Sequence, residues 1–145
     1  MECIFCRLVR DGDARWVARG REACAFAPPD PLAPGHTLVI PTSHRADIFD
    51  TPPDVLAHTM ALVQGVADAM RTELGAGGVN ILSAHGPAAE QSVPHLHFHV
   101  VPRWSDDAFS TWPTGQSRHR IVGDPVRRLA DAMSCTPATP PRGGR

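Results

Sequence analysis

Apolar positions between residues 54 and 74 recur at spacings of three and four, which is the pattern of an amphipathic helix. Thr51 or Asp54 is placed to cap the start of this helix, and Gly75 follows its last residue, where glycine is common. We therefore predict one long helix over 54–74, whose repeating face consists of Val55, Thr59, Val63, Val66, Met70 and Leu74.

Short apolar segments bounded by glycine, proline and polar residues indicate β-strands. A turn at Gly20 separates the first two segments. A loop over 28–35 precedes the third segment, because its four prolines fit neither a helix nor a central strand. A second, short helix is predicted over 125–133. The predicted strands are 14–19, 22–27, 36–40, 79–83 and 95–101.

These strands are joined by turns and loops, with only one long helix among them. Parallel winding would need more helices than the pattern provides. We therefore predict an α+β fold of two layers, a mostly antiparallel five-stranded sheet with the long helix packed on it. A chain of 145 residues fits one core, and we expect one domain over 1–133 and a disordered, Pro-, Gly- and Arg-rich tail over 134–145.

The composition is that of a soluble globular protein, with 42% hydrophobic and 20% charged residues and a net charge of -1. The near-neutral charge argues against a general nucleic-acid partner. No apolar run approaches the roughly 20 residues that span a bilayer, and the N-terminus does not read as a signal peptide. We therefore expect a cytoplasmic protein without a nucleic-acid or membrane partner.

The chain contains no lysine and no tyrosine but eight histidines. The absence of lysine excludes a Schiff-base lysine, a lysine-linked nucleotide and a phosphate-loop lysine. Histidine is therefore the first candidate for nucleophilic or acid–base chemistry.

Cys3 and Cys6 form a C-x-x-C pair, which fits either a redox pair or half of a zinc site. No strand precedes Cys3, so the redox interpretation is the weaker one. Two thiolates on one tight turn would hold half of a zinc site and would need two further ligands. Cys24 lies in an apolar segment and is expected in the core.

Three histidines alternate with apolar residues in the segment 95–101. On a strand, His95, His97 and His99 would share one face at intervals of roughly 6.5–7 Å, with the apolar residues facing the core. The residues leave two chemistries open. The row would either hold a metal, as H-x-H pairs do, or supply a nucleophilic imidazole that attacks phosphorus.

The run HLHFHVV over 95–101 resembles the histidine-triad motif H-φ-H-φ-H-φ-φ, which defines a family of nucleotide hydrolases and transferases. The surrounding segments are similar to the zinc-containing bacterial members of that family, and the resemblance covers residues 3–103. It implies a nucleotide substrate, an attack on an α-phosphorus and a homodimer. The similar segments are CIFC at 3–6, GHTLVIPTSH at 35–44, AAEQSVPH at 88–95 and VPR at 101–103.

The resemblance assigns a role to each matching residue. His97 would be the nucleophile that carries a nucleotidyl group, His99 would contact the phosphate, and His36 would support the triad from the adjacent strand. Phosphate contacts would come from Gln91 and Ser92, and Asn80 would orient the phosphate loop.

The resemblance also completes the zinc site with His44 and His95 beside Cys3 and Cys6. Two thiolates and two imidazoles make a closed tetrahedral site, so the zinc would be structural. Because His95 would be held by the metal, His97 two residues later would be pre-positioned.

Three positions depart from the family pattern. Pro28 stands where relatives carry an acidic residue for the ribose hydroxyls, with Asp30 as a substitute nearby. Glu90 replaces a glycine, and a carboxylate at that point would repel a polyphosphate unless it turned outward. His85 replaces a common asparagine. The resemblance implies a phosphoramidate, a dinucleoside polyphosphate or a related nucleotidyl ester as substrate, and these departures leave the base and the leaving group unspecified.

Two alternatives remain beside a hydrolase or transferase. Glu90 favours a non-catalytic module that binds a nucleotide or a partner without turnover. The other alternative is a catalytic zinc enzyme whose metal is held by His95, His97 and His99.

Overall fold

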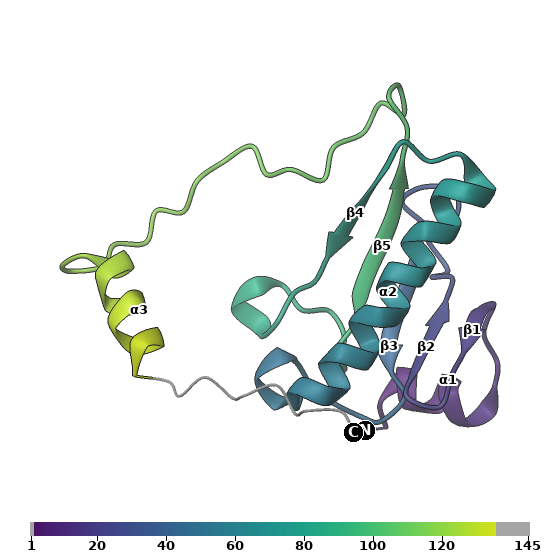
Figure 1. Ribbon diagram of the computed structural model, residues 1–145, viewed down its shortest axis with the longest axis horizontal. Coiled ribbons are helices and arrows are strands. Elements are labelled where there is room, and N and C mark those ends of the chain that lie inside the picture. The colour runs from purple at the N-terminus through teal and green to yellow at the C-terminus, as the bar shows by residue number, and fades with distance from the viewer. Residues whose placement is uncertain (1, 136–145) are drawn as a thin grey trace, which may run out of the picture. The chain divides into compact units, whose positions relative to one another are not determined.

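Five strands form one sheet in the order β1-β2-β3-β5-β4, and every neighbouring pair is antiparallel (Figure 1). The structure is a computed structural model that describes residues 2–135. The sheet and its helices confirm the predicted α+β fold. The strands are β1 (Trp16–Arg19), β2 (Ala23–Phe26), β3 (Thr37–Pro41), β4 (Gly78–Leu82) and β5 (Phe98–Arg103).

The long helix α2 (Pro53–Leu74) packs on one face of the sheet, mainly against β2, β3 and β5. The predicted side-chain cap is wrong, because Pro52 occupies the cap position and makes no side-chain bond there. Gly75 ends the helix at φ 64°, as glycine tolerates. Four of the six predicted face positions are buried, namely Thr59, Val63, Val66 and Met70.

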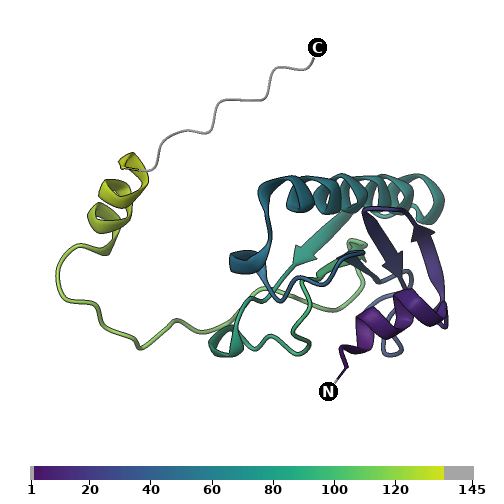
Figure 2. The same cartoon turned by 90° about the horizontal axis from the view of Figure 1, so that it is seen from below.

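A second helix, α1 (Ile4–Asp11), lies on the opposite side of the sheet from α2 (Figure 2). The sequence analysis interpreted this segment only as a turn that presents two cysteines. Phe5 of α1 packs with Phe26 and Leu38, whereas Ala25 and Val39 face α2. Both faces of the central strands are therefore covered.

Four of the five predicted strands are confirmed, with boundaries shifted by one or two residues. The fifth begins three residues later than predicted, at Phe98. His95 and His97 precede the ladder because the backbone of this segment bonds to loops, with Leu96 N donating to Arg45 O at 2.6 Å. The alternation still holds on the core side, where Leu96, Phe98 and Val100 are buried.

Residues 111–135 form a separate unit that contains α3 (Pro125–Ser134). The predicted helix over 125–133 is thereby confirmed, and the Asp124 carboxylate caps it by accepting from two backbone N–H groups. The predicted tail begins at Ser134, inside this helix, and its residues 136–145 lie outside the described part of the chain. Within residues 2–135, no helix is long and apolar enough to cross a membrane.

Candidate functional site

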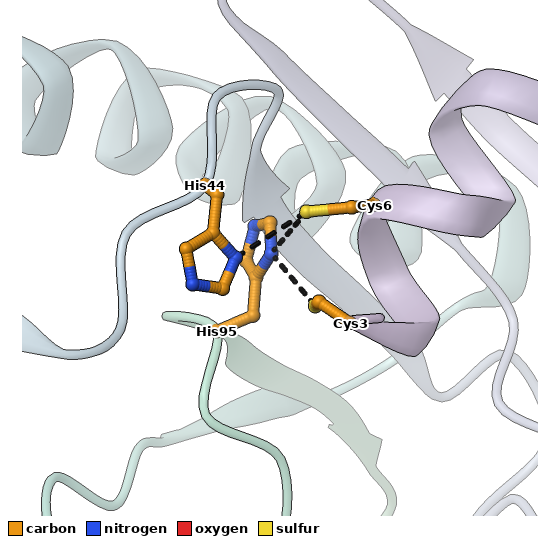
Figure 3. Close-up of side chains that lie close together, drawn as sticks. All are labelled: Cys3, Cys6, His44 and His95. Atoms are coloured by element: carbon orange, nitrogen blue, oxygen red, sulfur yellow. Dashed lines mark hydrogen bonds between the residues drawn. The ribbon is translucent and has the colours of Figure 1, made fainter. Parts of the chain in front are cut away.

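Four potential metal ligands converge from three distant parts of the chain (Figure 3). Cys3 is the cap residue of α1 and Cys6 lies one turn later, so both thiols lie on the same side of the helix. His44 follows β3 and His95 precedes β5. One ligand atom from each of the four side chains lies within 4.8 Å of all the others.

The distances in this cluster fit a tetrahedral zinc ion. Cys3 Sγ lies 3.5 Å from His95 Nδ1, and Cys6 Sγ lies 3.3 Å from His44 Nδ1 and 3.6 Å from His95 Nδ1. Two ligands of a tetrahedral zinc with these bond lengths are roughly 3.5 Å apart. His95 Nε2 donates to Pro41 O at 3.0 Å, which leaves the Nδ1 lone pair facing the thiols. The donor set therefore fits zinc.

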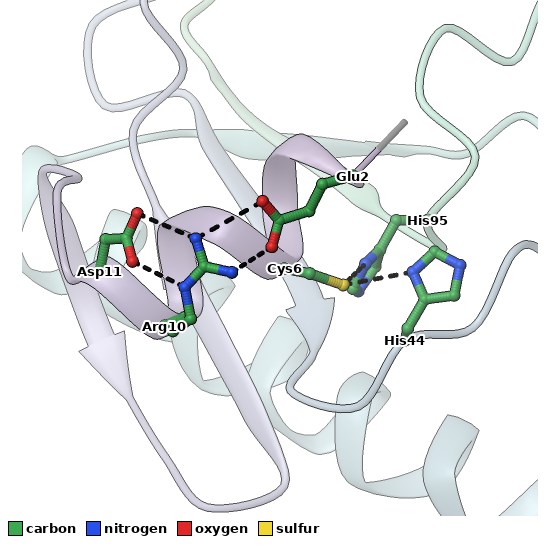
Figure 4. A network of polar contacts seen from close by, with 6 residues as sticks. All are labelled: Glu2, Cys6, Arg10, Asp11, His44 and His95. Atoms are coloured by element: carbon green, nitrogen blue, oxygen red, sulfur yellow. Dashed lines mark hydrogen bonds and ion pairs between the residues drawn. The ribbon is translucent and has the colours of Figure 1, made fainter.

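Charged side chains on the outer side of α1 hold the start of the chain next to this cluster. The Arg10 guanidinium pairs with Glu2, one residue before Cys3, and with Asp11 (Figure 4). All three side chains are exposed, so these pairs add little stability.

His97 is buried, with 4% of its surface exposed, and its ring is held by the backbone of His95. Its Nδ1 donates to His95 O at 2.7 Å, so the neutral ring keeps its lone pair on Nε2. Burial lowers the pKa of His97, which favours this neutral form. The ring also makes edge contacts with Phe5 of α1 and with His99, at centroid distances of 5.3 Å each.

A directed chain of hydrogen bonds sets the proton position on His99. The Leu32 backbone N–H donates to His36 Nδ1 at 3.0 Å, so the neutral His36 ring carries its proton on Nε2. That proton is donated to His99 Nδ1, also at 3.0 Å. His99 therefore keeps its own proton on Nε2. Burial, followed by the charges of the neighbouring histidines, lowers the pKa of His99 to about 4, so the ring is neutral at pH 7.

A cavity of about 690 Å³ lies between α1, the central strands and the proline-rich loop. Phe5, which touches His97, and His36, which bonds to His99, both line it. The cavity therefore adjoins the histidines. Its remaining walls are mostly apolar and include Ile4, Leu8, Phe26 and Leu38.

Gln91 and Ser92, the two predicted phosphate ligands before the histidine strand, differ in how they are bonded. The Gln91 amide is fully engaged with backbone: Oε1 accepts from Gly86 N, and Nε2 donates to Ala46 O and Val93 O. Ser92 is exposed, and its hydroxyl makes no hydrogen bond within residues 2–135.

Asn80 is not brought to the histidines. It lies in β4 opposite Val101, two residues along the strand from Leu82, which is opposite His99. Its side-chain oxygen accepts from Arg103 at 2.7 Å. The amide of Asn80 thus belongs to the end of the sheet where Arg103 lies.

The departures from the family pattern lie around the same site. Pro28 lines the cavity, whereas Asp30 is exposed and does not line it. Glu90 is exposed and adopts φ 65°, a conformation that favours glycine. The sequence analysis did not identify Phe5 as a site residue. The spacing of Ile4, Phe5 and Leu8 is that of one helix face and could have indicated an apolar helix surface next to the two cysteines.

The chain is similar to known proteins over most of its length. The profile of the HIT domain family matches residues 10–106. An uncharacterized HIT-like protein of Saccharolobus solfataricus is 37% identical over 106 residues, which cover 72% of this chain and 76% of that protein. The adenosine 5′-monophosphoramidase of Saccharomyces cerevisiae is 30% identical, over 83% of this chain and 76% of its own length.

Two further similarities concern activity and metal. The adenylylsulfatase of Arabidopsis thaliana is 31% identical, over 92% of this chain and 67% of its own length. The crystal structure of a zinc-bound histidine triad family protein from Mycobacterium smegmatis superimposes with a TM-score of 0.72 at 41% identity. The superposition covers 77% of this chain and 81% of the Mycobacterium smegmatis chain.

Proposed function

This chain belongs to the HIT domain family, and from that premise we propose that it is a nucleotide hydrolase or nucleotidyl transferase that acts at an α-phosphorus through a nucleotidyl-histidine intermediate. The observation that carries the proposal is the pair of neutral rings with opposite roles. His97 has a free lone pair on Nε2, and His99 beside it has a proton on Nε2. One ring can attack phosphorus while the other donates to a phosphate oxygen.

The reaction proceeds in two displacements. In the first, the Nε2 lone pair of His97 forms a bond to the α-phosphorus, and the leaving group departs with its bonding pair; a basic leaving group such as an amine takes a proton from solvent. In the second, water attacks the phosphorus, the P–N bond breaks, and the proton that water loses balances the one gained by the leaving group. A transferase would replace water with another hydroxyl or phosphate acceptor.

The cavity beside the histidines is the proposed nucleoside subsite. Its volume and its apolar walls from α1 and β2 suit a flat aromatic base. The phosphate would then lie at the end lined by His36. Two relatives named for phosphoramidate and adenylylsulfate chemistry support an adenylyl-type donor.

We further propose that Cys3, Cys6, His44 and His95 hold a structural zinc. The ion would neutralise two adjacent thiolates and cross-link α1 to the segment before β5. Gln91 would act by holding the loop between Gly86 and Val93, while the exposed hydroxyl of Ser92 would donate to phosphate or leaving group.

The proposal is tested by intact-protein mass after brief incubation with nucleoside phosphoramidates, dinucleoside polyphosphates and adenylylsulfate. We expect an adduct of one nucleotidyl group that maps to His97. The adduct disappears in His97→Gly and persists in His58→Gly, which removes an exposed histidine of α2. No adduct and no released nucleotide from any donor would overturn the proposal.

Glu90 favours a second candidate, a module that binds nucleotide without turnover. Glu90 is the residue before Gln91 in the loop beside the site, where a negative charge would oppose the phosphate of a substrate. That candidate predicts saturable nucleotide binding with no adduct. The catalytic-zinc alternative has less support: among residues 2–135 the converging ligands are Cys3, Cys6, His44 and His95, without His97 or His99.

A further inference from the structure

A chain of three hydrogen bonds ends on the backbone carbonyl of His97. The Ile48 backbone N–H donates to His85 Nδ1 at 3.0 Å. His85 Nε2 contacts Ser83 Oγ at 2.9 Å, and Ser83 Oγ donates to His97 O at 2.8 Å. The function proposed above uses neither Ser83 nor His85.

The two ends of this chain fix its direction. A backbone N–H can only donate, so His85 Nδ1 must accept and the neutral ring carries its proton on Nε2. A carbonyl can only accept, so the Ser83 hydroxyl must donate to His97 and must itself accept from His85. His85 and Ser83 thus each accept one hydrogen bond and donate one, so the chain runs in a single direction from Ile48 to His97.

The position of Ser83, one residue beyond the end of β4, lets its hydroxyl donate to the His97 carbonyl. The ladder between β4 and β5 ends at the pair Leu82 and His99, so within residues 2–135 the backbone of β4 is not paired with His97. Ser83, the next residue of the chain, supplies that bond with its hydroxyl. It thus extends the sheet contact by one residue toward the nucleophile.

The segment 45–48 anchors the nucleophile from both sides. Arg45 O accepts from Leu96 N at 2.6 Å, while Ile48 N begins the chain to His97 O. The peptide groups on either side of Leu96 and His97 are therefore tied to one short loop. Because the His97 ring also bonds to His95 O, its orientation depends on this same backbone.

We propose that Ser83 and His85 are positioning residues that set the orientation of the His97 imidazole through its backbone carbonyl. The role of His97 as nucleophile rests on the proposed function, whereas the fixed position of its ring does not. Ser83 and His85 do not touch the reacting atoms. Their loss misplaces the attacking nitrogen without removing it.

The kinetic test uses the full chain and adenosine 5′-monophosphoramidate. We expect Ser83→Ala to lower kcat about fivefold, as loss of one hydrogen bond implies, with KM within about twofold of wild type. Ser83→Thr keeps the hydroxyl and restores kcat. Ser105→Ala, which removes an exposed serine, leaves both constants unchanged. Equal kcat in wild type and Ser83→Ala overturns the proposal.

A second readout does not depend on turnover. Nitrogen-15 NMR of the imidazoles is expected to show His85 protonated on Nε2 and a shift of the His97 ring signals in Ser83→Ala. If wild type turns over no donor, the proposed function fails while this measurement still decides the positioning role. A proton on Nδ1 of His85, or unchanged His97 signals in Ser83→Ala, overturns it.

Discussion

The chemistry of individual residues in this protein is set by which ring nitrogen carries the proton. His97 donates to a carbonyl through Nδ1, whereas His99 accepts a hydrogen bond from His36 at Nδ1, so the two rings present opposite functions at Nε2. Burial keeps both neutral by lowering their pKa values. The same residue type thus presents a free lone pair on one ring and a hydrogen-bond donor on the ring beside it.

Removal of the titrating ring of His99 should change how stability depends on pH. Folding lowers the pKa of His99 from 6.5 to about 4, so between these values the unfolded chain binds the proton that the folded chain does not. As pH falls from 6.5 to 4, wild type should lose stability relative to His99→Gln. The slope is below about 1.4 kcal/mol per pH unit, because the ring is partly solvent-screened.

Urea unfolding of both proteins at pH 7, 6, 5 and 4.5 measures this difference. Proton binding by the metal ligands affects both proteins equally and cancels. A pH-independent difference between wild type and His99→Gln would contradict the prediction.

The carboxylate of Glu90 should weaken the binding of anionic substrates. Glu90→Gln removes the charge, and Glu90→Gly also removes the left-handed strain at φ 65°. We expect KM for a nucleotide donor to fall about twofold to fivefold in both variants at low salt and to approach wild type near 0.5 M salt, where screening is strong. Glu73→Gln, on the exposed end of α2, should leave KM unchanged.

At the scale of elements, α1 connects the proposed metal site to the proposed nucleoside cavity. Cys3 and Cys6 lie at its start, while Phe5 packs against His97 and lines the cavity. The helix has only eight residues, a length that is not stable in isolation. Its position therefore depends on the core beneath it and on the contacts that Cys3 and Cys6, at its first turn, make with His44 and His95.

Removal of zinc should therefore loosen α1 and lower thermal stability. We expect one zinc per chain in the purified protein and none in Cys6→Ser, with a fall in Tm of roughly 10 °C. Elemental analysis and calorimetry measure the two effects. Cys135→Ser, which replaces an exposed cysteine outside the cluster, serves as the control. A full zinc content in Cys6→Ser would contradict the assignment of the ligands.

At the scale of the whole molecule, the sheet within residues 2–110 has two edges, β1 and β4. Beside the β4 edge, Ile81 is 45% exposed and Met60 of α2 is 38% exposed. An apolar edge of this kind is a common contact between protein copies. It is therefore the surface at which the homodimer implied by the family resemblance is expected.

Sedimentation equilibrium should give a mass near twice 15.6 kDa for the wild-type chain. Ile81→Arg should shift the mass toward one chain, because a charge at an apolar contact is costly to bury. Leu32→Arg places the same charge at an exposed loop position and should not change the mass. A monomeric wild type at micromolar concentration would refute the dimer.

Much of the fold could be read from the sequence because helices and strands have local signatures. The spacing of apolar residues predicted α2, and short apolar runs between breakers predicted the five strands. The alternation in 95–101 identified the buried residues Leu96, Phe98 and Val100. The predicted strand over 95–101 starts three residues too early, since loop contacts of Leu96 replace the ladder before Phe98.

Only the tertiary structure decided which atoms meet. Cys3 and His95 are 92 residues apart in the chain, and their approach depends on how α1 packs on the sheet. The proton position on His99 follows from Leu32 and His36, and the backbone bonds of Gln91 follow from the loop that surrounds it. A hydrogen bond between distant residues leaves no periodic trace in the sequence. Residue type and period therefore established the fold and the available chemistry, while packing determined the direction of each bond.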